Sequence, residues 1–158
     1  MKRWMVNALK MSIALVGVIV LLLCIFWLPK MAKISAEMFP EVSYLKYPVL
    51  FGIYFTCIPF YIGIFHTFKL LKLIDKKNAF TKEACKSLRV IVFSAIGVIV
   101  FYTAGIIYLN KEAALPPGLG LVGIAIIFAS FVIAVFASVL KELLMKVIEI
   151  KNENDLTI

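Results

Sequence analysis

Apolar residues in this chain gather in four long runs, and short polar segments separate them. The runs predict helices at about 8–28, 49–71, 88–109 and 119–144. At a rise of about 1.5 Å per residue, about 20 apolar residues cross a hydrocarbon core about 30 Å thick. Backbone amides in lipid must find partners within their own segment, so helices are expected rather than strands. The pattern predicts an all-α, polytopic membrane protein with four transmembrane helices in an antiparallel bundle.

The composition agrees with a membrane protein. Of 158 residues, 63% are hydrophobic and 16% are charged, and the mean hydropathy is +1.03, whereas a soluble domain has about 25% charged residues. A water-soluble core of this size could not bury so much apolar surface, so the excess must face lipid. The length fits a single domain over residues 1–158.

The first run could also be read as a signal peptide, because it has a basic start at Lys2, Arg3 and Lys10. Its apolar stretch is long for that role, however. Lys30 and Lys33 then follow where a polar, uncharged cleavage region should lie. We therefore expect this run to be an uncleaved membrane anchor.

The cationic residues are distributed unevenly among the polar segments. Of the 17 Lys and Arg residues, 13 lie before the first span, between the second and third, or after the fourth. The other two connections hold the remaining four. Because cationic loops are retained in the cytoplasm, both termini and the segment 72–89 are expected there. The chain is thus predicted to be a multi-pass protein of the cell membrane.

The segment KLIDKKNAFTKEACKSLR (72–89) is the most polar internal stretch. Membrane insertion alone explains its charge, and the alternative is an added role in contacting anionic lipid or a protein partner. Thr81 is a suitable N-cap and Glu83 would lie in the first turn, which predicts a helix starting near Lys82. No direct nucleic-acid binding is expected. The candidate contact residues are Lys76, Lys77, Phe80, Thr81, Lys82, Lys86 and Arg89.

The larger of the two outer connections carries an amphipathic pattern. Met31, Ile34 and Met38 fall on one helical face, and charged residues fall on the other. We expect a short interfacial helix at about 30–39, ended by Pro40.

The fourth run contains small residues at helical spacing. Ser130, Ala134 and Ser138 recur every four positions, and Ala125 and Ala129 form a second pair. Such residues let helices approach closely in lipid. Packing within one chain and a homodimer through this helix are both open. Beyond the span, the helix is expected to continue to about residue 151, followed by a frayed acidic end.

Few groups within the predicted spans could perform chemistry. All nine acids lie in loops or tails. His66, the only histidine, lies near the cytoplasmic end of the second span, on the same helix as Pro59. We expect His66 to bond to a neighbouring helix and Pro59 to kink its own. These two residues are the intramembrane candidates for function.

The cysteines and the missing motifs argue against catalysis. One His cannot supply bis-histidine haem ligation, and no Cys/His cluster has metal-binding spacing. Cys24 and Cys57 lie in apolar helix and Cys85 faces the cytoplasm, so no disulfide framework is implied. No hydrolase, zinc or phosphate-loop motif is found. We expect a protein that is not an enzyme and holds no cofactor or metal.

Two segments carry a family resemblance. LLKLIDKKNAFTKEACKSLR after the second span and KELLMKVIEIKNENDLTI after the fourth resemble the YoaS-like integral membrane family of Gram-positive bacteria, a domain of unknown function (2975). Members of that family look like companions of a small helix-turn-helix regulator encoded beside them. The resemblance implies a bacterial cell membrane and a transcriptional regulator as cytoplasmic partner. It supplies no catalytic or ligand residues.

Two classes of function remain. The first is a non-enzymatic signalling or regulatory membrane component that presents segments 72–89 and 141–158 to a cytoplasmic partner. The alternative is a small transport or export component, or a self-protection (immunity) protein against a membrane-active peptide. The charged, ordered cytoplasmic surface and the lack of buried ionisable groups favour the first class.

Overall fold

The computed structural model describes residues 2–113, 115 and 117–156, and within these ranges every regular element is a helix. The elements in chain order are α1 (Arg3–Leu22), η1 (Leu23–Trp27), α2 (Leu28–Met38), η2 (Pro40–Leu45), α3 (Lys46–Asp75), α4 (Lys82–Lys111) and α5 (Pro117–Leu156). Among the described residues, four helical stretches are long and apolar enough to cross a membrane: Arg3–Met38, Pro40–Asp75, Lys82–Lys111 and Pro117–Leu156. The predicted all-helical class and its four candidate spans are confirmed.

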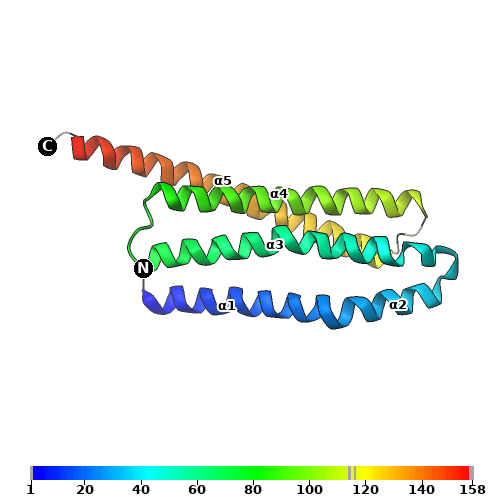
Figure 1. Ribbon diagram of the computed structural model, residues 1–158. Coiled ribbons are helices and arrows are strands. Elements are labelled where there is room, and N and C mark those ends of the chain that lie inside the picture. Colours follow the sequence, from blue (N-terminus) through cyan, green and yellow to red (C-terminus); the bar gives the residue numbers. More distant parts are fainter. Residues whose placement is uncertain (1, 114, 116, 157–158) are drawn as a thin grey trace.

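The long helices make their main contacts in chain order. α1 packs against α3, α3 against α4, and α4 against α5 (Figure 1). In the described part of the chain, α1 makes no comparable contact with α4 or α5. α1 begins and α5 ends at the same end of the molecule, where the last turns of α5 extend beyond the other helices (Figure 1). α3 and α4 are therefore the inner helices, and α1 and α5 the outer ones.

The first candidate span differs from a regular α-helix at one turn. α1 continues into α2 through η1, a π-helical turn of five residues. Its backbone hydrogen bonds join residues five apart instead of four, so the turn is wide. The helix expected at 30–39 corresponds to α2, Leu28–Met38. It follows η1 directly, and Pro29 stands in its first turn.

The last helix is longer than expected. α5 runs for 40 residues to Leu156, whereas the sequence suggested an end near residue 151. The expected frayed end is therefore helical up to Leu156, and residues 157–158 lie outside the described residues.

α5 packs on α4 through small side chains. Its buried residues are Gly120, Gly123, Ser130, Ala134 and Ala137. A Cβ atom added to Gly123 would lie 2.8 Å from Cδ1 of Ile106 in α4, closer than real Cβ contacts. The absence of a side chain at Gly123 therefore leaves room for the end of the Ile106 side chain between the two helices.

The small residues predicted on this helix divide between two faces. Ser130 and Ala134 belong to the buried face, and Ser138 is half-buried and donates a hydrogen bond to the carbonyl of Ala134 at 2.8 Å. Ala125 and Ala129 are exposed. Packing within the chain thus uses the first set. The homodimer stays a prediction, for which the exposed pair remains available.

α3 and α4 approach each other at two glycines. A Cβ on Gly63 of α3 would lie 3.6 Å from Cβ of Ser94, and a Cβ on Gly97 of α4 would lie 3.6 Å from Cβ of Pro59. α3 continues through Pro59 as one helix of 30 residues. The kink expected at Pro59 stays a prediction, and the proline ring packs against α4 at Gly97.

α1 and η1 meet α3 through polar groups. The hydroxyl of Tyr54 donates to the carbonyl of Cys24 at 2.7 Å, and that of Tyr61 donates to the carbonyl of Gly17 at 2.8 Å. Between these two hydrogen bonds, the sulfur atoms of Cys24 and Cys57 lie 3.3 Å apart. These hydrogen bonds satisfy phenol groups that would otherwise be unpaired in lipid.

Candidate functional site

The turn between α3 and α4 has a defined backbone conformation. Asn78 donates its N–H to the carbonyl of Leu73 at 2.8 Å, and Lys77 donates to Ile74 at 3.1 Å. This pair of bonds is a Schellman motif, which ends a helix with one residue in the left-handed region. Lys77 is that residue, with a φ of 60°, although glycine would adopt this conformation at lower cost.

The start of α4 is capped by Thr81, as the sequence predicted. Its Oγ1 accepts a hydrogen bond from the N–H of Ala84 at 3.3 Å and donates one to the carbonyl of Asn78 at 3.0 Å. α4 then begins at Lys82. The Schellman motif and the N-cap together fix the direction in which the first turn of α4 leaves α3.

The first turns of α4 separate basic from buried residues. Lys82, Lys86 and Arg89 are exposed and lie at i, i+4 and i+7, which places them on one face of the helix. The other side of these turns packs against the protein. Its buried residues are Ala84, Ser87 and Leu88.

Both acids of this segment are paired with lysines from neighbouring helices. Asp75 forms an ion pair with Lys10 of α1, and Glu83 with Lys69 of α3, each at 3.3 Å. We call five exposed cations, which lie in the turn after α3 and the first turns of α4, the basic face; they are Lys76, Lys77, Lys82, Lys86 and Arg89. In the described part of the chain, no ion pair neutralises any of them. The basic face thus offers uncompensated positive charge.

The remaining predicted contact residues lie beside the basic face. Phe80 is 54% exposed in the turn, and Thr81 is half-buried because it serves as the cap. An exposed aromatic ring among cations can contribute apolar contact to a protein partner. All seven candidates therefore lie in the turn and the first turns of α4.

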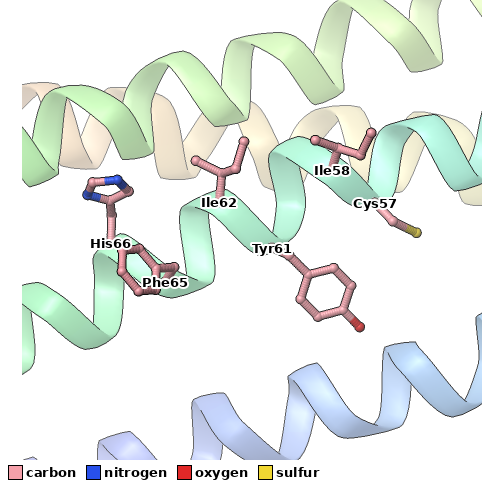
Figure 2. A pocket seen from close by; sticks show the side chains of 6 residues that line it. All are labelled: Cys57, Ile58, Tyr61, Ile62, Phe65 and His66. Atoms are coloured by element: carbon pink, nitrogen blue, oxygen red, sulfur yellow. The ribbon is translucent and has the colours of Figure 1, made fainter.

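The two intramembrane candidates lie elsewhere, on α3. His66 ends a groove of about 520 Å³ lined by Cys57, Ile58, Tyr61, Ile62, Phe65 and His66. In Figure 2, Cys57 and Tyr61 point toward α1, whereas His66 points toward α4. Nδ1 of His66 is buried and has no hydrogen-bond partner among the described residues. This atom does not form the expected bond to a neighbouring helix.

The sequence carries no local signal for the contacts that join distant parts of the chain. Lys10 and Asp75 are 65 positions apart, and Cys24 and Cys57 are 33 apart. No local spacing indicates such pairs. The only available signal for the first pair was its predicted location, since both residues were expected on the cytoplasmic side.

Comparison with known proteins places the chain in a family. Residues 30–158 match the family described as protein of unknown function, DUF2975. The chain is also 46% identical over 160 residues to a protein of Bacillus subtilis (strain 168) described as uncharacterized membrane protein YoaS, and the match covers the full length of both. This chain belongs to the DUF2975 family.

Membership confirms the resemblance that segments 70–89 and 141–158 indicated. The part of this chain that matches the family, residues 30–158, includes α3, α4 and α5, and thus the complete basic face. The relative supports a membrane protein, in agreement with the four candidate spans. No solved structure matches the chain.

Proposed function

We propose that this DUF2975 protein is a non-enzymatic signalling or regulatory component of the bacterial cell membrane, and that its basic face docks a cytoplasmic protein with an acidic surface. The observation that carries the proposal is that the cations of the basic face are exposed and form no ion pairs in the described part of the chain. Asp75 and Glu83, by contrast, are occupied by Lys10 and Lys69. Insertion requires the charge but not a fixed helix start.

The proposed topology is an antiparallel bundle of four spans with both termini in the cytoplasm. The distribution of 13 cationic residues against four supports this orientation. Two contacts support the antiparallel arrangement, because each joins segments that such a bundle places at one end. Lys10 pairs with Asp75 on the expected cytoplasmic side, and Tyr44 donates a hydrogen bond to Glu112 on the expected outer side.

The partner expected from the family resemblance is a helix-turn-helix transcriptional regulator. Electrostatic attraction brings an acidic patch to a basic surface and sets the rate of encounter. The fixed start of α4 then aligns Lys82, Lys86 and Arg89 along one face, so that all three can contact one partner surface. The docking proposal therefore depends on both the charge and its geometry.

The experiment compares variants with equal loss of charge. Lys86→Gln and Arg89→Gln are combined in one variant, and Lys2→Gln and Arg3→Gln in the control. Both remove two exposed cations from the same predicted side. Co-purification of the regulator encoded beside the gene, normalised to protein in the membrane, should fall about tenfold or more in the first variant only, since several contacts are lost.

A second pair of variants tests geometry without changing charge. Thr81→Ala should weaken the start of α4 by about 1 kcal/mol and reduce partner yield, whereas Thr81→Ser keeps the cap and the yield. Equal yield from all variants would reject docking at the basic face.

The orientation is checked separately by cysteine labelling in a chain whose native cysteines are replaced by serine. A cysteine at Ser43 should react with a membrane-impermeant reagent added outside the cell, and a cysteine at Asn78 should not.

A further inference from the structure

The contact between η1 and α3 brings two thiols together inside a candidate membrane span. Cys24 is buried in the wide turn η1, Cys57 is half-buried on α3, and their sulfur atoms are 3.3 Å apart. Both are free cysteines. A disulfide needs about 2.05 Å between the sulfurs, so the two sulfurs are little more than 1 Å beyond bonding distance.

The backbone around the pair is held in place on both sides. Tyr54, about one helical turn before Cys57, bonds the carbonyl of Cys24 at 2.7 Å. Tyr61, about one turn after Cys57, bonds the carbonyl of Gly17 at 2.8 Å. These hydrogen bonds fix α1 against α3 at the level of the two sulfurs. The fold therefore holds the two thiols close together.

One of the two thiols can be reached from the lipid. Cys57 lines the groove of about 520 Å³ on α3, whose other walls are mostly apolar and include Ile58 and Phe65, exposed by 55% and 65%. The groove is shallow and open, because all six residues that line it belong to α3. Cys24 is buried and does not line this groove. An apolar molecule in the bilayer would therefore meet Cys57 first.

We propose that Cys24 and Cys57 form a redox pair that a lipid-soluble quinone, bound in this groove, oxidises to a disulfide between η1 and α3. The low dielectric of the membrane makes a free thiolate or any other isolated charge expensive. The oxidant must therefore accept protons together with electrons and must itself dissolve in lipid. A quinone meets both conditions, because it becomes a neutral quinol.

The reaction balances with these three partners. The sulfur of Cys57 bonds to a ring carbon of the quinone, and its proton passes to one quinone oxygen. The sulfur of Cys24 then bonds to that of Cys57, the carbon–sulfur bond breaks, and its electron pair stays on the ring. The proton of Cys24 passes to the second quinone oxygen. Two thiols lose two electrons and two protons, and one quinone becomes one quinol.

The test uses the full-length chain, reduced and reconstituted in vesicles of phosphatidylethanolamine and phosphatidylglycerol. A fully substituted benzoquinone with a decyl chain is added, because its ring leaves no free position for a stable thiol adduct. We expect about one quinol per chain and a cross-linked peptide containing Cys24 and Cys57. Oxidation should be at least about ten times faster than with the same amount of aqueous hydrogen peroxide, which needs a thiolate.

Matched variants separate the pair from the groove. Cys85→Ser should behave as the unaltered chain, whereas Cys24→Ser or Cys57→Ser should form no quinol above background. Ile62→Trp fills the groove but keeps both thiols, so it should slow oxidation by the quinone at least about fivefold and leave iodine-driven disulfide formation unchanged. Absence of the cross-linked peptide, equal quinol from either single-serine variant, or unaltered quinone oxidation in Ile62→Trp would overturn the proposal.

Discussion

The two outer helices are attached to the inner ones in different ways. α5 packs on α4 through a stripe of small residues, and at Gly123 an added Cβ would come within 2.8 Å of Ile106. α1 buries only Val6 among its described residues. It and η1 are joined to α3 by hydrogen bonds from Tyr54 and Tyr61. One interface depends on close fit, and the other on a few polar contacts.

The difference follows from the solvent. Lipid tails are as apolar as the side chains that they contact, so apolar surface alone does not drive two helices together. Attraction must come from close approach of backbones or from hydrogen bonds that lipid cannot supply. α5 uses the first and α1 the second. Substitutions that damage one interface should therefore leave the other nearly unchanged.

The largest effect is expected at the α4–α5 interface. Gly123→Val should lower the free energy of unfolding by about 1–3 kcal/mol, because Ile106 must leave its present position and the branched side chain needs further room between α4 and α5. Gly105→Val is the control, since a Cβ at Gly105 meets no atom within 4 Å. Unfolding by sodium dodecyl sulfate in mixed micelles, followed by circular dichroism, measures both. An equal loss in the control would show that close fit is not the cause.

A smaller effect is expected where α1 meets α3. Tyr54→Phe combined with Tyr61→Phe removes both hydroxyl donors and keeps the rings, so the loss should be about 1 kcal/mol in total. Tyr108→Phe is the control, because Tyr108 is partly exposed and its hydroxyl makes no hydrogen bond in the described part of the chain. Proteolysis of α1 in micelles should become faster in the double variant alone. Unchanged proteolysis would contradict the role given to these hydrogen bonds.

The smallest effect is expected at the Tyr44–Glu112 contact, outside the spans. The hydrogen bond to Glu112 raises the pKa of Tyr44 above its usual value. The contact thus stabilises the fold fully below about pH 10, the usual Tyr value, and is lost as pH rises through the raised pKa. The stability difference between the unaltered chain and Tyr44→Phe should shrink over that interval. The effect of Gly123→Val should not change with pH, which separates a polar contact from a close fit.

The sequence predicted those features that depend on local pattern. Four apolar runs were enough to predict the four candidate spans, since length and hydropathy alone determine them. Thr81 and Glu83 located the start of α4, because an N-cap acts within one turn. Ser130 and Ala134 indicated the packing face of α5, although the pattern could not name α4 as the neighbour.

Contacts between helices could not be predicted from the sequence, for a physical reason. A helix that is apolar on all sides has no periodicity to show which side meets which neighbour, so the approach of Cys24 to Cys57 left no signal. The left-handed conformation at Lys77 was also hidden, because glycine or asparagine usually marks that position. At the candidate site, the residue types were predictable, but the pairing of Asp75 with Lys10 depends on tertiary structure.

The wide turn η1, Leu23–Trp27, also affects how the chain tolerates changes in length. In a regular α-helix each residue turns the chain by about 100°, so deleting one residue rotates everything beyond it away from its neighbours. A π-helical turn holds one residue more than the α-helical turn it replaces. Removing one residue there can close the turn to α-helical geometry while α1 and α2 keep their orientations. η1 is thus the place where the first candidate span can lose a residue without losing its register.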